Sequence, residues 1–163
     1  MINKIRNWRG HSFLAIPVRL YLGYVFIAAC IHKIASPADF AIDIATYQIL
    51  PIILINPMAI ALPWIELVSG AMIILAFRTR TAALMMAGMM FMFTVAVILA
   101  LAQGLDMSCG CFASQGAVDE DPISWLTVLR DVVWMALALY VLACDRCPLG
   151  VDRLLSRQKR APN

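Results

Sequence analysis

Residues 81–102 read TAALMMAGMMFMFTVAVILALA, a stretch of twenty-two residues without a single charged side chain. A helix needs roughly 20 apolar residues to cross the hydrocarbon core of a bilayer, and this stretch has that length. Inside a membrane the backbone must satisfy its own hydrogen bonds. The stretch is therefore predicted to be a transmembrane helix.

Three further stretches of the same kind surround it. The predicted spans are residues 17–34, 57–77, 81–102 and 122–143. Of the 163 residues in the chain, 63% are hydrophobic and 14% are charged, whereas soluble domains are about half apolar and about a quarter charged. We therefore predict an all-α membrane protein, with a single transmembrane domain over residues 1–163 folded as a four-helix bundle.

A shorter amphipathic segment, residues 37–50, follows the first span. One helical face of it is apolar and holds Phe40, Ile44 and Tyr47. Acidic residues fall on another face, and fourteen residues are too few to cross the bilayer. We predict an extra helix lying in the membrane interface, which Pro51 and Pro57 separate from the second span.

Basic residues gather on one side of the predicted membrane. They precede the first span, join the second span to the third and follow the fourth: Lys4, Arg6, Arg9, Arg78, Arg80, Arg146, Arg153, Arg157, Lys159 and Arg160. Because positively charged loops stay in the cytoplasm, both termini, including the basic tail 144–163, are predicted to be cytoplasmic in a bacterial inner membrane. This topology accounts for the net charge of +3, which gives no indication of nucleic-acid binding.

The triplet Cys109-Gly110-Cys111 lies between the third and fourth spans. The topology puts this loop outside the cytoplasm, where disulfides persist. Gly110 permits the tight turn that a disulfide between such close cysteines requires, and strained disulfides are the labile, oxidising ones. We predict that Cys109 and Cys111 form a redox-active pair; a static disulfide and a metal-binding thiol pair are the alternatives.

The other three cysteines are weaker candidates. Cys30 lies near the outer end of the first span and could serve as a third, resolving thiol, although a buried packing cysteine is the commoner role for this residue type. Cys144 and Cys147 have the spacing of a redox motif but lie at the cytoplasmic end of the fourth span. A membrane thickness of roughly 30 Å excludes their direct exchange with the outer pair, and their role stays open.

Ionisable residues at membrane depth form the second candidate site. Arg19, Glu66, Arg130 and Asp131 fall in or near the spans, where charges are costly and usually mark function. Glu66 needs a partner, and Arg19, Arg130 or Lys33 could supply one. The candidate cofactor is a quinone, whose carbonyl oxygens accept hydrogen bonds from Arg19, Lys33 or Arg130, with Glu66 handling a proton. A structural polar network that sets helix register is the alternative.

Several short motifs spread over residues 17–143 form a recognisable pattern. They are Arg19, Leu22-Gly23, Phe26, Lys33, Phe40, Tyr47, Leu50-Pro51, Leu62-Pro63-Trp64-Ile65-Glu66, Gly70, Cys109-Gly110-Cys111-Phe112 and Arg130-Asp131. The pattern resembles the MauE branch of the DoxX-like membrane proteins, named for methylamine utilisation. One position departs from it, because Ala113 follows Phe112 where the family pattern often has glycine.

The resemblance implies a four-helix inner-membrane protein that supports disulfide formation in a periplasmic enzyme subunit, alongside a thioredoxin-like protein. Carried over by position, the redox pair is Cys109 and Cys111, and the polar bundle residues are Arg19, Lys33, Glu66 and Arg130.

The leading hypothesis is a membrane thiol–disulfide oxidoreductase, or its accessory, that exchanges disulfides with a periplasmic thioredoxin-like or substrate protein. One alternative is a non-enzymatic membrane anchor or scaffold of a redox complex. Another is a membrane protein that binds a thiophilic metal or a sulfur species through Cys30, Cys109 and Cys111.

Overall fold

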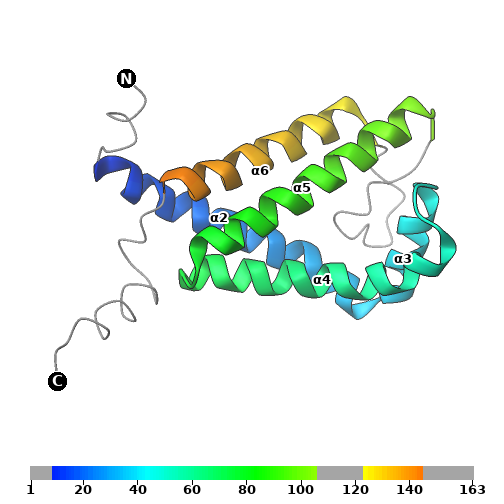
Figure 1. Cartoon of the computed structure of the whole chain (residues 1–163), viewed down its shortest axis with the longest axis horizontal. Coiled ribbons are helices and arrows are strands. Elements are labelled where there is room, and N and C mark those ends of the chain that lie inside the picture. Colours follow the sequence, from blue (N-terminus) through cyan, green and yellow to red (C-terminus); the bar gives the residue numbers. More distant parts are fainter. Residues whose placement is uncertain (1–8, 106–122, 145–163) are drawn as a thin grey trace.

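Four long helices and one short helix make up the part of the chain that this computed structural model describes, residues 9–105 and 123–144 (Figure 1). They are α2 (Arg9–Ala35), α3 (Pro37–Thr46), α4 (Ile52–Leu75), α5 (Thr79–Ala102) and α6 (Trp125–Cys144). No strand occurs within those residues, so the all-α prediction is confirmed. Cys109, Cys111, Cys147 and nearly all of the basic tail lie outside the described residues.

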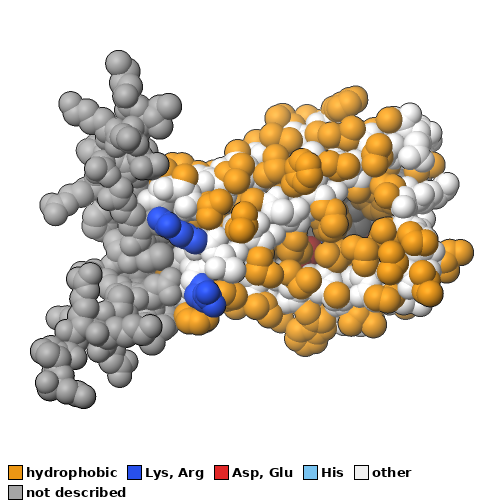
Figure 2. All heavy atoms as spheres, viewed as in Figure 1, with side chains coloured by type: hydrophobic (Ala, Val, Ile, Leu, Met, Phe, Trp, Pro, Cys, Tyr) orange, Lys and Arg blue, Asp and Glu red, His pale blue; other side chains and the backbone are white. Residues whose placement is uncertain are grey.

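The four long helices correspond to the four predicted spans. Their apolar segments are Leu14–Ala35, Ile52–Leu75, Thr79–Ala102 and Trp125–Cys144, with mean hydropathies of 1.9, 2.0, 2.4 and 1.8. Each is long and apolar enough to cross a membrane. Hydrophobic side chains cover most of the described face in Figure 2, as contact with lipid requires. These features indicate a multi-pass membrane protein.

The predicted extra helix between the first two spans is α3. Ser36 is its N-cap residue and Pro37 its first helical residue, where the missing N–H of proline costs nothing. The helix buries Phe40 and Ile44. It ends at Thr46, earlier than predicted, because the backbone turns left-handed at Gln48 (φ 54°).

Two predicted boundaries were wrong. Pro57 does not separate α3 from the second span, because α4 already begins at Ile52 after Pro51 and continues through Pro57. Pro57 lies inside α4, where its ring removes the hydrogen bond to the carbonyl group of Ile53, a loss that transmembrane helices tolerate. Helix α6 begins at Trp125 rather than at residue 122, since the N–H of Ser124 bonds to Oγ1 of Thr127 (3.3 Å) in a capping arrangement.

The helices associate in two close pairs. Helix α2 packs chiefly along α4, and α5 packs chiefly along α6. Figure 1 shows α3 at one end of the bundle and the α4–α5 connection at the opposite end. A continuous core of buried apolar residues joins the pairs; among its members are Leu22, Phe26, Phe40, Ile73, Met86 and Val141.

Candidate functional site

Helices α2 and α4 approach closely where each carries a glycine. A Cβ atom added to Gly23 would overlap the side chain of Ile74 and lie 3.1 Å from the carbonyl oxygen of Gly70. Small residues at such a crossing let helix backbones pack tightly in a membrane. Because the two helices run in opposite directions, the crossing brings Lys33, near the end of α2, against Glu66 of α4.

Lys33 and Glu66 form a sealed ion pair. Nζ of Lys33 donates to both carboxylate oxygens of Glu66, at 3.0 and 3.1 Å, and the two side chains are 2% and 3% exposed. The ammonium group also lies 4.9 Å from the ring centre of Phe40 and 5.4 Å from that of Phe93. Both rings can stabilise the cation through their faces. Of the three basic residues considered as partners of Glu66, Lys33 is therefore the one that makes the pair.

A second ion pair lies on α6. Nη2 of Arg130 is 3.3 Å from Oδ1 of Asp131, but the Arg130 side chain is 35% exposed whereas that of Asp131 is 2% exposed. The guanidinium group also stacks 4.9 Å from the ring centre of Trp134. The other oxygen of Asp131, Oδ2, is buried and has no hydrogen-bond partner among the described residues. An unpaired buried carboxylate oxygen is unusual and requires an explanation.

A small cavity, here called the inner cavity, brings the two pairs together. Its volume is about 20 Å³, and Val25, Phe26, Ala29, Lys33, Glu66, Met90, Phe93, Asp131 and Trp134 line it. Lys33, Glu66 and Asp131 come from α2, α4 and α6. The sequence indicated Asp131 only as one of several intramembrane charges, and its position beside the Lys33–Glu66 pair could not be read from spacing.

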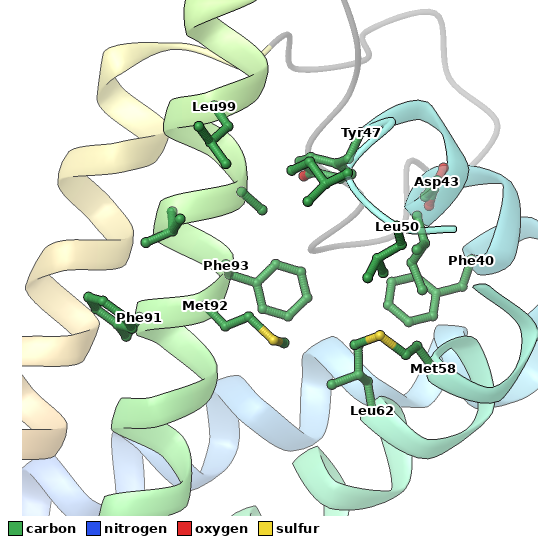
Figure 3. Close-up of a pocket in the computed structure, with 14 residues that line it drawn as sticks. Phe40, Asp43, Tyr47, Leu50, Met58, Leu62, Phe91, Met92, Phe93 and Leu99 are labelled. Atoms are coloured by element: carbon green, nitrogen blue, oxygen red, sulfur yellow. The ribbon is translucent and has the colours of Figure 1, made fainter. Parts of the chain in front are cut away.

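A larger apolar cavity opens between α3, α4 and α5 (Figure 3). Its volume is about 460 Å³, within the range of small-molecule sites. Figure 3 shows Phe93 and Met92 of α5 pointing across it toward Met58 and Leu62 of α4. Further lining residues come from α3, from the segment that follows it and from the C-terminal half of α5; they are Phe40, Asp43, Ile44, Tyr47, Ile49, Leu50, Phe91, Val95, Ala96 and Leu99. Phe93 lines both cavities and thus forms part of the wall between them.

Tyr47 connects the apolar cavity to the second ion pair. The side chain is buried, and burial together with the negative charges of Asp131 and Asp43 raises the pKa of Tyr47 to about 12. Arg130 acts in the opposite direction. Tyr47 thus lines the apolar cavity, and its pKa depends on the charge of Asp131. The amphipathic pattern of the segment did not predict this position.

The predicted site residues do not all meet. Arg19 is buried on α2 but lies fourteen residues before Lys33, about 21 Å away along the helix axis. It is therefore not part of the inner cavity. Cys30 is fully buried one turn before Lys33, and its Sγ contacts the carbonyl oxygen of Ile27 at 3.1 Å. Within residues 9–105 and 123–144, no group of three or more His, Cys, Asp or Glu side chains could hold a metal ion.

Comparisons with known proteins point to one family. A family model described as "Methylamine utilisation protein MauE" matches residues 11–144. Methylamine utilization protein MauE of Paracoccus denitrificans is 29% identical over 125 residues, which cover 76% of this chain and 66% of that protein. The proteins of the same name from Methylophilus methylotrophus and Methylorubrum extorquens are 29% and 31% identical, over 80% and 77% of this chain. The match spans 66% to 68% of the length of these relatives, and no solved structure matches the chain.

Proposed function

Because this chain belongs to the MauE family, we propose that it is an inner-membrane protein of methylamine utilisation that supports thiol–disulfide exchange outside the cytoplasm. The family and the relatives' names support the link to methylamine utilisation. The exchange itself is inferred from the pair Cys109 and Cys111.

The observation that carries this proposal is the position of the pair in the chain. Cys109 and Cys111 belong to the connection that leaves α5 after Ala102 and enters α6 at Trp125. Both helix ends lie at the end of the bundle that holds α3 (Figure 1). The connection between α4 and α5 lies at the opposite end, with Arg78 in it and Arg80 in the first turn of α5.

The charge distribution then supports an orientation. Positively charged connections stay in the cytoplasm, so the end with Arg78 and Arg80 and both chain termini would be cytoplasmic. The end with α3 and the cysteine pair would face the periplasm. That compartment is oxidising and contains the proteins with which a thiol pair at a membrane surface can react.

The proposed chemistry is a balanced exchange. A thiolate of a reduced partner protein attacks the Cys109–Cys111 disulfide and forms a mixed disulfide. The second thiolate of the partner then attacks that bond, so the partner leaves oxidised and the pair is left as two thiols. A periplasmic thioredoxin-like protein or the substrate protein itself is the proposed partner.

Renewal of the Cys109–Cys111 disulfide requires an acceptor for two electrons and two protons. A lipid-soluble quinone supplies that chemistry when bound. The apolar cavity has a suitable volume and is lined by aromatic rings and thioethers, which suit a planar ring. Of the residues predicted to hold a quinone, Lys33 contacts Phe40 and Phe93 of the cavity wall, whereas Arg19 lies far from them.

Trapping of mixed disulfides tests the exchange. In Cys109→Ser or Cys111→Ser, the second step is blocked, so one of the two variants should accumulate a covalent complex that reductant releases. Cys144→Ser, at the far end of α6, is the matched control and should trap nothing. If neither variant traps a partner, and the pair stays oxidised when mild reductant is added, the protein is a membrane scaffold with a fixed disulfide.

A further inference from the structure

Two of the residues that line the inner cavity carry polar groups with unused hydrogen-bonding capacity. The ammonium group of Lys33 has three N–H donors, of which two are directed at Oε1 and Oε2 of Glu66. Oδ2 of Asp131 accepts no hydrogen bond from the described residues. Asp131 is 1% exposed, so neither bulk water nor a lipid headgroup reaches this oxygen. A donor-bearing and an acceptor-bearing side chain thus border the same small cavity.

The size and chemistry of that space fit one small molecule. The inner cavity has a volume of about 20 Å³, and a water molecule needs about 10–15 Å³ and two to four polar partners. Lys33 can donate to a water, while Glu66 and Asp131 can accept from it. The remaining walls are apolar and include Phe26 and Met90, so a larger polar ligand would find neither room nor partners.

We propose that the inner cavity binds a single internal water molecule that joins the two ion pairs into one network. The water accepts a hydrogen bond from Nζ of Lys33 and donates to Oδ2 of Asp131 and to the carboxylate of Glu66. The network then ties α2, α4 and α6 together toward the end of the bundle that holds α3. It also connects two carboxyl groups, so when one of them is protonated the water can accept that proton and give one of its own to the other carboxylate. This proposal is independent of the thiol chemistry.

Hydroxyl-radical footprinting in heavy-oxygen water tests for the molecule. Radicals formed from a bound water oxidise the side chains beside it, even where lipid and protein exclude solvent. Met90 lines the inner cavity, whereas its neighbour Met89 is similarly buried (7% exposed against 9%) and does not line it. In the full chain in lipid nanodiscs, heavy oxygen should enter Met90 while Met89 stays at background.

Two neighbouring substitutions show whether the label depends on the cavity. Ala29 lines the inner cavity, and Ala28 is similarly half-buried on α2 but does not line it. Ala29→Leu should fill the inner cavity and abolish the labelling of Met90, whereas Ala28→Leu should leave the labelling of Met90 unchanged. If thermal unfolding shows that Ala29→Leu does not fold, the smaller substitution Ala29→Val replaces it. An unlabelled Met90 in the unsubstituted protein, or equal labelling in both variants, would overturn the proposal.

Discussion

The two ion pairs of the bundle are built in opposite ways. Lys33–Glu66 joins two helices, is at most 3% exposed on either side chain and uses both carboxylate oxygens. Arg130–Asp131 joins neighbours on one helix, with a guanidinium group that is 35% exposed and a carboxylate oxygen without a described partner. The first arrangement holds two helices together with both carboxylate oxygens in use. The second leaves a buried carboxylate oxygen without a described partner, on a residue that lines the inner cavity.

Removal of one member of the sealed pair should have the largest effect. Lys33→Ala leaves the buried carboxylate of Glu66 without its cation, which should lower the free energy of unfolding by about 3–5 kcal/mol. The double variant Lys33→Met/Glu66→Gln removes both charges and should recover most of that loss. Unfolding in lipid nanodiscs measures both, and equal losses in the single and double variants would show that charge compensation is not the cause.

Disturbance of the crossing that aligns the sealed pair should have the next largest effect. In Gly23→Val the side chain collides with Ile74 and approaches the backbone of Gly70, so α2 and α4 must separate at a cost of about 1–3 kcal/mol. Gly88→Val is the control, because a Cβ at Gly88 meets nothing within 4 Å. The unfolding temperatures should fall for the first variant and stay nearly unchanged for the second. A similar fall in both would mean that the α2–α4 crossing is not tightly packed.

Loss of the half-exposed Arg130 side chain should lower the free energy of unfolding by less than loss of Lys33 does. In Arg130→Ala, Asp131 can take up a proton and become neutral, and partly exposed pairs contribute at most about 1 kcal/mol. The same unfolding measurement as for Lys33→Ala compares the two pairs directly. If the two losses are equal, the distinction between a sealed and an open pair is wrong.

The pKa of Tyr47 should respond to the charge of the Arg130–Asp131 pair and not to that of the Lys33–Glu66 pair. Burial raises its pKa to about 12, with further contributions from the carboxylates of Asp131 and Asp43. Asp131→Asn should lower the pKa of Tyr47, whereas Glu66→Gln should leave it unchanged. Titration of the phenolate absorbance measures both. Because the folded protein holds this proton more tightly than the unfolded chain, the contribution of Tyr47 to stability is complete below about pH 10 and is lost as the pH rises toward about 12. If Glu66→Gln changes the pKa of Tyr47 and Asp131→Asn does not, the described geometry is wrong.

The sequence was sufficient to predict features that depend on local composition. The four spans and α3 follow from runs of apolar residues and from the Ser36-Pro37 start, because hydropathy and capping act over a few turns of chain. The start of α4 was misjudged because Pro57 was taken as a helix break, whereas transmembrane helices tolerate a proline in their interior.

The pairing of charges could not be predicted in the same way. Three basic residues were equal candidates for Glu66, and the choice of Lys33 depends on where Gly23 and Gly70 let α2 and α4 cross. Likewise, the unpaired oxygen of Asp131 depends on how α6 is rotated against α2 and α4. These are properties of the packed bundle, and no single segment of sequence encodes them.

Labelling of intact cells with a membrane-impermeant maleimide, after gentle reduction, tests the central claim most directly. If Cys109 and Cys111 form an exchanging pair on the periplasmic face, the reagent should modify both. It should spare Cys144 and Cys147 until the membrane is permeabilised. Modification of Cys144 and Cys147 in intact cells, with Cys109 and Cys111 unmodified, would invert the orientation and contradict the proposed function.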